Sequence, residues 1–349
     1  MKYSRKILGI IISFVIVFNT FDSQAGNEQR AGQSGAAQLL INPWARSNGY
    51  GTAGSAFVKG IEAQYSNVAG TAFTKKTEIL FARSELYGGS GISINSFGIS
   101  QKTGEYGVLG LSIMSMSFGE IERTTVDMPE GGLGTFTPQY LNIILSYAKE
   151  FSNSIYGGFA IKIVNEGISD ASANGIAVDA GIQYVASERL RLGIALKNVG
   201  PTMKYSGDGL SFRGYNGDDN YKMTVMHRTE KFELPSLIRI GLAYDAYSVE
   251  NHRVTALGTF TSNAFSNDLY SLGAEYGLYE KFLFRAGYTM ERNMYKDDES
   301  MSIYSGLSGG LSVVLPFKKD SESKFELDYS YCATKVLNGV HTFGVRVDL

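Results

Sequence analysis

The sequence of 349 residues contains only one cysteine, one tryptophan, six prolines and three histidines. The single cysteine, Cys332, excludes an intramolecular disulfide framework. His227, His252 and His341 have no spacing typical of a metal site, and no G-x-S-x-G motif for a serine nucleophile occurs. These absences predict a protein that is not an enzyme and that holds neither a metal nor another cofactor.

Long apolar segments and long basic segments are also missing. After the N-terminus, no segment is apolar over the roughly 18 residues that a membrane-spanning helix needs. No long basic run occurs either, which argues against nucleic acid as a partner.

The N-terminus has the pattern of a secretory signal peptide. Three basic residues lie within the first six positions, Ile7–Phe18 is almost wholly apolar, and Ser23–Ala25 offers small residues for cleavage. We therefore expect residues 1–25 to be removed on export, which shifts the formal net charge from −2 to about −4. Export without a membrane helix leaves open a soluble secreted protein and an outer-membrane β-barrel.

The abundant residues favour the barrel. The chain has 41 glycines, 22 tyrosines and 20 phenylalanines. Apolar and polar residues alternate along many segments, for example in Ile238–Tyr244 and in the last one, His341–Leu349. A soluble sandwich alternates in the same way with its apolar side inward, whereas a membrane barrel turns that side to lipid.

Strand lengths and connections separate these two classes. From Glu78 on we count about 14 strands of mostly about 10 to 14 residues, longer than is usual in soluble sheets. They are expected at 77–87, 91–101, 106–118, 137–149, 154–166, 173–186, 189–199, 235–245, 251–262, 267–278, 280–290, 302–315, 323–335 and 340–349. The three long connections, Gly119–Phe136, Gly200–Pro235 and Glu291–Met301, all fall at the end opposite the chain termini, as the long outer loops of bacterial barrels do.

We therefore predict an all-β fold, a transmembrane antiparallel β-barrel over residues 76–349 in the outer membrane of a Gram-negative bacterium. Outer-membrane lipid is the first partner that this implies. Residues 26–75 do not alternate and are expected to form an N-terminal periplasmic or plug segment with a short helix.

The segment before the barrel resembles the opening of the FadL-like outer-membrane family. The match lies in Ala45–Arg46, Gly49, Gly51, Ala53–Gly54 and Ala56–Val58, and then in N-V-A-G-T-A, with Asn67 and Gly70. The overlapping L-L-I-N-P-W-A-R, with Asn42, Pro43, Trp44 and Arg46, is together with the chain length most similar to the PorV/PorQ branch found with type IX secretion systems. We interpret Asn42, Pro43, Trp44, Arg46, Asn67 and Gly70 as a structural plug motif.

The resemblance implies a non-catalytic barrel that binds protein partners through its outer loops. The expected partners are the type IX translocon barrel, the sortase of the cell-surface attachment complex and the C-terminal signal domains of cargo. The alternative implied by the same family is a transporter of hydrophobic small molecules. Transport requires a lateral opening or a lumen pocket, for which Gly88–Gly91 and Gly306–Gly310 are candidate breaks in the wall.

Two sets of residues are candidate sites. Charged residues that alternate with apolar ones are expected to line the lumen, as an ion-pair network that holds the plug or as a selective channel lining. These are Arg191, Arg239, Glu275, Arg285 and Glu326. The loop Gly200–Pro235 is long and rich in aromatic and methionine residues, which favours a partner-binding surface over a loop that merely caps its own barrel. Its candidate contacts are Met203, Tyr205, Phe212, Tyr215, Tyr221, Met223 and Met226.

Overall fold

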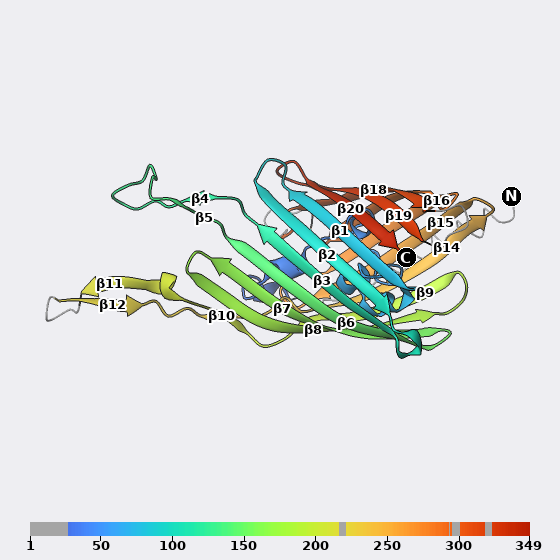
Figure 1. Cartoon of the computed structure of the whole chain (residues 1–349), viewed down its shortest axis with the longest axis horizontal. Helices are drawn as coiled ribbons and strands as arrows, with labels where there is room; N and C mark the ends of the chain where they lie inside the picture. Colours follow the sequence, from blue (N-terminus) through green and yellow to red (C-terminus); the bar gives the residue numbers. More distant parts are fainter. Residues whose placement is uncertain (1–26, 216–220, 293, 295–300, 318–322) are drawn as a thin grey trace.

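The computed structural model describes residues 27–349 except 216–220, 293, 295–300 and 318–322 (Figure 1). In this part of the chain, 14 antiparallel strands form a closed barrel, in which consecutive strands pair and β1 pairs with β20. The strands are β1 (Thr77–Leu86), β2 (Ile92–Lys102), β3 (Val108–Ser117), β6 (Gln139–Ser152), β7 (Ile155–Ile168), β8 (Ala171–Val185), β9 (Leu190–Val199), β14 (Leu237–Val249), β15 (His252–Asn263), β16 (Leu269–Leu278), β17 (Phe282–Glu291), β18 (Tyr304–Pro316), β19 (Lys324–Thr334) and β20 (Val340–Asp348). The predicted barrel is confirmed, with strand bounds shifted by at most four residues.

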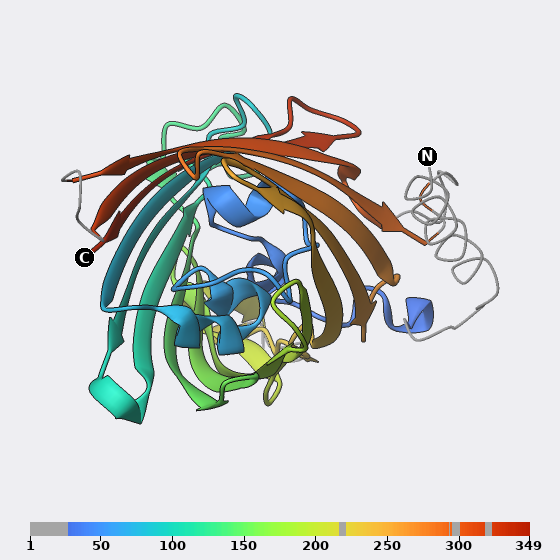
Figure 2. The same cartoon turned by 90° about the vertical axis from the view of Figure 1, so that its right-hand side faces the viewer.

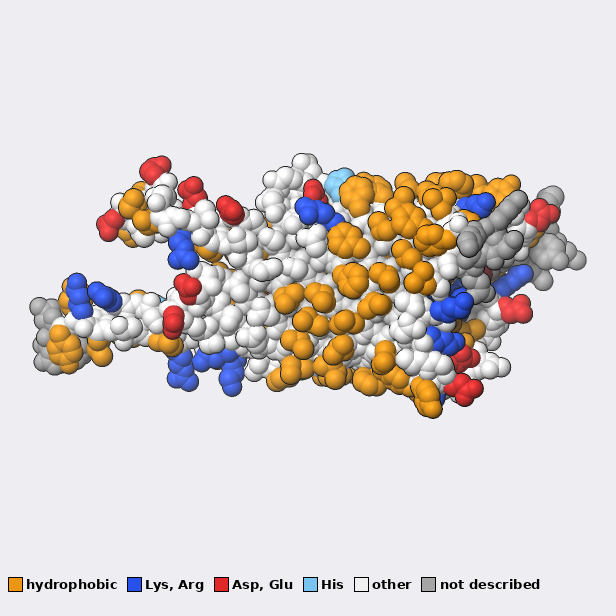
Figure 3. Space-filling model, viewed as in Figure 1, with side chains coloured by type: hydrophobic (Ala, Val, Ile, Leu, Met, Phe, Trp, Pro, Cys, Tyr) orange, Lys and Arg blue, Asp and Glu red, His pale blue; other side chains and the backbone are white. Residues whose placement is uncertain are grey.

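The apolar side of the strands faces outward. On β14, Ile238 and Ile240 are about half exposed (45% and 50%), whereas Arg239 between them is 4% exposed. Hydrophobic side chains accordingly cover the visible face of the barrel wall in Figure 3, and charged ones gather toward its ends. This arrangement suits a lipid-facing wall and excludes a sandwich with an apolar core. No helix within the described ranges is long and apolar enough to cross a membrane.

The two ends of the barrel differ in their connections. Short turns and one-turn helices such as η4 (Gly104–Tyr106) join strands at the end where the chain terminates, whereas two long excursions of the described residues project from the other end (Figure 1). Most of the third predicted long connection, Glu291–Met301, lies outside the described residues. One contains β4 (Ile121–Glu122) and β5 (Thr135–Phe136), and the other contains β10 (Met203–Ser206), η5 (Asp208–Leu210), β11 (Ser211–Tyr215), β12 (Lys222–Met226) and β13 (Lys231–Phe232). Long loops mark the outer end of bacterial barrels, so we call this the outer end and the other the periplasmic end.

Residues 36–74 form a plug inside the barrel (Figure 2). The plug contains η2 (Ala37–Leu40), α2 (Ala45–Asn48), α3 (Ala63–Ser66) and η3 (Val68–Phe73), after which the chain enters β1 at the periplasmic end. Trp44 and Ile61 of the plug pack against Leu80 and Ala82, which β1 turns inward. Two further apolar clusters join the plug to the wall, one around Phe57 and Leu257 and one around Leu39 and Val164.

Glycines of the wall let the plug backbone approach closely. A Cβ on Gly193 of β9 would lie 2.5 Å from the carbonyl oxygen of Ser55, and one on Gly273 of β16 would lie 2.9 Å from Cβ of Tyr50. No larger side chain fits at these positions without displacing the plug. Part of the high glycine content is therefore explained by plug packing.

The first described residues lie at the outer end. After η1 (Glu28–Arg30), the Arg30 guanidinium contacts the Glu233 carboxylate at 2.6 Å and lies over the Phe265 ring at 4.2 Å. The backbone N–H of Gly35 donates to the Glu233 carbonyl at 3.0 Å. Glu233 precedes β14 and Phe265 lies between β15 and β16, both at the outer end. A periplasmic position for the start of the segment 26–75 does not fit these contacts, because the chain enters the lumen from outside and leaves it at the periplasmic end.

An epitope tag inserted between Gly26 and Asn27 is expected to bind antibody on intact cells, because residues 30–35 are held against the outer loops. The same tag inserted after Tyr279, in the turn between β16 and β17, is expected to bind only after permeabilisation. The opposite pattern in whole-cell immunofluorescence would contradict this orientation.

Candidate functional site

A cavity of about 320 Å³ lies inside the barrel at its outer end, between the plug and the wall from β14 to β20. Most of its lining is apolar and includes Leu40 of the plug, Leu237, Leu269, Met294 and Val340. Small-molecule sites have volumes of about 300 to 1,000 Å³ and mostly apolar walls with a few polar groups. The cavity has both properties.

Arg239 is the cationic side chain that lines this cavity. It is 4% exposed and donates hydrogen bonds to the carbonyl oxygen of Tyr65 at 3.2 Å and to the Tyr65 hydroxyl at 3.3 Å. Its Nε has no hydrogen-bond partner, and no carboxylate among the described residues lies within ion-pair distance. Glu291 also lines the cavity, but its carboxylate accepts hydrogen bonds from Asn267 and from the backbone N–H groups of Met301 and Ser302.

Three hydroxyl groups face the same space. The Oγ atoms of Thr261, Thr289 and Ser308 have no hydrogen-bond partner within the described part of the chain, and all three residues line the cavity. Buried polar atoms in folded proteins are nearly always hydrogen-bonded. The lumen at this point therefore offers one buried cation and unused hydroxyl groups inside an otherwise apolar lining.

The barrel wall is irregular beside the cavity. Residues 305–307 of β18 stand opposite the single residue Ala333 of β19, and β18 pairs with β17 only as far as Leu307. Gly306 within this bulge has φ +94°, which favours glycine. Leu307 is 60% exposed on the outside of the wall, and its residue also borders the cavity, so only the bulged strand separates the cavity from the outer surface here. The candidate break at Gly306–Gly310 thus coincides with a bulge, whereas Gly88–Gly91 belongs to the turn between β1 and β2.

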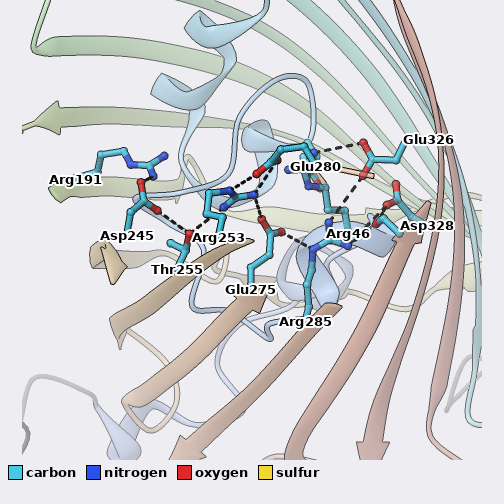
Figure 4. Close-up of polar contacts among 12 residues, drawn as sticks. Arg46, Arg191, Asp245, Arg253, Thr255, Glu275, Glu280, Arg285, Glu326 and Asp328 are labelled. Carbon is cyan, nitrogen blue, oxygen red and sulfur yellow. Dashed lines mark hydrogen bonds and ion pairs between the residues drawn. The ribbon is translucent and has the colours of Figure 1, made fainter. Parts of the chain in front are cut away.

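The other predicted lumen charges are paired (Figure 4). Arg191 contacts Asp245 at 2.8 Å, and Glu275 contacts Arg285 at 2.7 Å. Arg285 also lies 3.8 Å from Glu326. A second network joins Lys162, Asp179 and Lys197 at 2.6 and 2.7 Å. Because an isolated buried charge is costly, each of these groups depends on the partner that it has here.

The plug takes part in this charge network. Glu62 accepts a hydrogen bond from Arg346 of β20 and lies 3.7 Å from Arg46, which in turn lies 3.6 Å from Glu326. Lys197 of β9 donates to the carbonyl oxygen of Gln64 at 3.1 Å. The plug is therefore fixed to opposite sides of the barrel by charged groups.

The residues of the predicted plug motif lie in the plug. The Asn42 side chain accepts from the Trp44 N–H at 3.1 Å, just before α2, and Pro43 stands between them. Asn67 accepts from the Ala69 N–H at 3.1 Å and donates to the carbonyl oxygen of Ile182 at 3.0 Å. A Cβ on Gly70 would overlap the carbonyl oxygen of Val58.

The seven candidate contacts of the long loop separate into two groups. Met203 is 1% exposed in a cluster with η2, and the Tyr205 hydroxyl donates to Glu166, because β10 joins the edge of β8 as part of the wall. The Met203 side chain is therefore not available to a partner, whereas Tyr205 is half-buried. The other five are exposed on the hairpin of β11 and β12 and the residue before β12: Phe212, Tyr215, Tyr221, Met223 and Met226.

The cavity hydroxyls were not singled out from the sequence. Thr261, Thr289 and Ser308 sit at inward positions near the outer ends of predicted strands, but many other small polar residues share that pattern. In the described ranges, no group of three or more His, Cys, Asp or Glu side chains is arranged to hold a metal ion.

Comparison with known proteins places the fold. No protein-family model and no curated protein sequence matches the chain. Solved structures do. The CymD monoaromatic hydrocarbon channel matches with a TM-score of 0.51 at 13% identity, over 88% of this chain and 97% of that one. A FadL homologue from Pseudomonas aeruginosa matches with a TM-score of 0.53 at 13% identity, over 87% and 97%.

The toluene transporter TodX from Pseudomonas putida also matches, with a TM-score of 0.50 at 12% identity, over 86% of this chain and 96% of that one. The fold is FadL-like. The closed barrel and its apolar outer wall are those of an outer-membrane protein, which confirms the predicted location. Identities this low show the fold alone, and the PorV/PorQ assignment stays a prediction.

Replacing Glu62 with Gln is expected to loosen the plug, because it leaves Arg346 and Arg46 short of a counter-charge. Breaking a buried ion pair costs about 3 to 5 kcal/mol. The variant should unfold at lower urea concentration in detergent and conduct more ions in planar bilayers. The matched control is Glu85→Gln on the exposed outer surface, where the pair with Arg83 contributes about 0 to 1 kcal/mol. Equal urea midpoints and conductances for the two variants would contradict the anchoring role.

Proposed function

We propose that the protein is an outer-membrane channel that binds small hydrophobic molecules with an acidic head group in its lumen and passes them across the membrane. The apolar lining of the cavity accepts the body of such a molecule. The unpaired guanidinium of Arg239 accepts its carboxylate, with Thr261 and Thr289 as further donors. The buried cation without a counter-ion is the observation that carries this proposal.

Two further features support transport. The wall is irregular beside the cavity, at the bulge of Gly306, where opening of the pairing between β17 and β18 would give an apolar molecule a route that avoids water. Solved structures with the same fold include the CymD monoaromatic hydrocarbon channel and the toluene transporter TodX. Passage toward the periplasm would require the plug to shift, because residues 36–74 fill the lumen below the cavity.

Binding of 11-(dansylamino)undecanoic acid to the purified barrel tests the proposal. Replacing Arg239 with Gln should weaken binding of this acid about 10- to 100-fold, since hydrogen bonds to charged groups contribute about 1.5 to 3 kcal/mol. Binding of its methyl ester should change little, because the ester carries no charge. The measurement is the fluorescence titration of both probes.

The control variant is Arg191→Gln, which lies at the periplasmic end and is paired with Asp245. It should bind both probes like the original protein. Equal losses for acid and ester in Arg239→Gln, or no loss for either, would contradict the assignment of Arg239.

A second candidate function is docking of protein partners, as in the type IX secretion machinery. The hairpin of β11 and β12 favours it, because five aromatic and methionine side chains are exposed there, beyond the end of the barrel (Figure 1). Apolar anchors of this kind are typical of interfaces.

The test is a deletion narrower than the whole loop, because β10 and β13 belong to the wall. Replacing residues 210–227 with a Gly-Ser linker should leave a heat-modifiable barrel that still binds the acidic probe. Recovery of a translocon barrel, a sortase or cargo from outer membranes in mild detergent should be lost. Unchanged recovery of these proteins would exclude the hairpin as their docking site.

A further inference from the structure

The hairpin of β11 and β12 has two free edges. The two strands pair only with each other, as a separate two-stranded sheet. The base of the hairpin is anchored through the Gly209 N–H, which donates to the Asp170 carbonyl at 3.1 Å in the turn between β7 and β8. All five residues of β12 are exposed. Isolated hairpins are marginally stable in water, and an exposed edge is a template for another strand.

The pairing pattern identifies the free backbone groups. The His227 N–H donates to the Leu210 carbonyl at 2.8 Å, so these two residues form a hydrogen-bonded pair. In antiparallel ladders such pairs alternate with non-hydrogen-bonded ones, whose N–H and C=O groups point to the outer edges. Along the register, the N–H groups of Lys222, Thr224 and Met226 therefore point away from β11.

The two faces of the hairpin differ in chemistry. Successive side chains of a strand point to opposite faces, so the register places Phe212, Met223 and Val225 on one face. The Phe212 ring stacks on His227 at 4.4 Å on this apolar face. The opposite face carries Arg213 and Lys222 together with Tyr215, Thr224 and Met226.

The second face is cationic. Residues 209–215 and 221–229 contain three bases, Arg213, Lys222 and Arg228, and no acid. None of the three forms an ion pair among the described residues. The sequence places Asp218 and Asp219 between the two strands, outside the described residues. The hairpin also projects away from the apolar wall, which separates it from lipid (Figure 3).

We propose that the free edge of β12 accepts an extended segment of a partner protein in which apolar and acidic residues alternate. The added strand pairs with Lys222–Met226, its apolar side chains join Met223 and Val225, and its acids face Lys222 and Arg213. This inference rests on the second candidate function and specifies its partner. Main-chain pairing supplies affinity in such strand addition, and alternate side chains supply specificity.

The test uses a fluorescein-labelled decapeptide of alternating Glu and Val and the intact barrel in detergent, measured by fluorescence anisotropy. The peptide should bind at least tenfold more tightly than one of alternating Lys and Val. It should also bind at least tenfold more tightly than a peptide of the same composition with glutamates grouped in pairs. Equal binding of the three peptides would overturn the proposal.

Two changes remove the edge hydrogen bonds. Thr224→Pro removes an N–H that points outward, at an edge position where a strand tolerates proline. This variant should no longer bind the peptide. Thr224→Val keeps the N–H and should bind the peptide normally. Methylation of alternate backbone nitrogens of the Glu–Val peptide removes the N–H donors from the peptide instead, with the protein unchanged. Equal binding of the methylated and unmethylated peptides would exclude strand addition.

The outcomes separate this proposal from the functions it builds on. Thr224→Pro should still bind the dansylated acid, since the cavity is not altered. If deletion of residues 210–227 abolishes partner recovery but the Glu–Val peptide does not bind the intact barrel, the hairpin is a docking site and strand addition is overturned. Binding of lipopolysaccharide vesicles that depends on Arg213 and Lys222, without peptide binding, would replace the protein partner with a lipid surface.

Discussion

Neutralisation of charge inside a lumen enclosed by lipid is the constraint on which this structure depends. A wall that meets lipid must turn its polar side chains inward, where they lose water and need partners. The plug supplies part of these partners: Glu62 meets Arg346 and Arg46, and the carbonyl of Gln64 meets Lys197. Plug and barrel are therefore one electrostatic unit, and the plug position follows from the wall charges.

The charge of Arg239 is not neutralised by a carboxylate among the described residues. Arg239 shares the inward orientation of its neighbours, but it meets the hydroxyl and carbonyl of Tyr65 in place of a carboxylate, and it faces an apolar cavity. The bulge at Gly306 lies beside the same cavity. A buried cation, unused hydroxyls and an irregular wall in one place are the features on which the proposed acidic amphiphile rests.

The sequence predicts the barrel well because one physical contrast, lipid against lumen, acts on every strand: Ile238, Arg239 and Ile240 alternate as the wall requires. It does not predict that Arg239 lacks a carboxylate, because its neighbours come from a plug segment far away in the chain. Nor does it predict Met203 and Tyr205 in the wall. β9 ends at Val199 after Asn198 takes φ +58°, which leaves the outer part of β8 to pair with β10. Local patterns do not specify such strand replacement.

The outer end thus combines a lumen cavity near β14–β20 with a hairpin that rises beside β8, and the two use different residues. Binding of an acidic amphiphile at Arg239 is tested most directly by a crystal structure with a bromine-labelled fatty acid, read by anomalous scattering. We expect one bromine peak in the cavity, with the carboxylate of the same molecule on Arg239. Peaks only along the outer wall, with Arg239 unoccupied, would contradict this expectation.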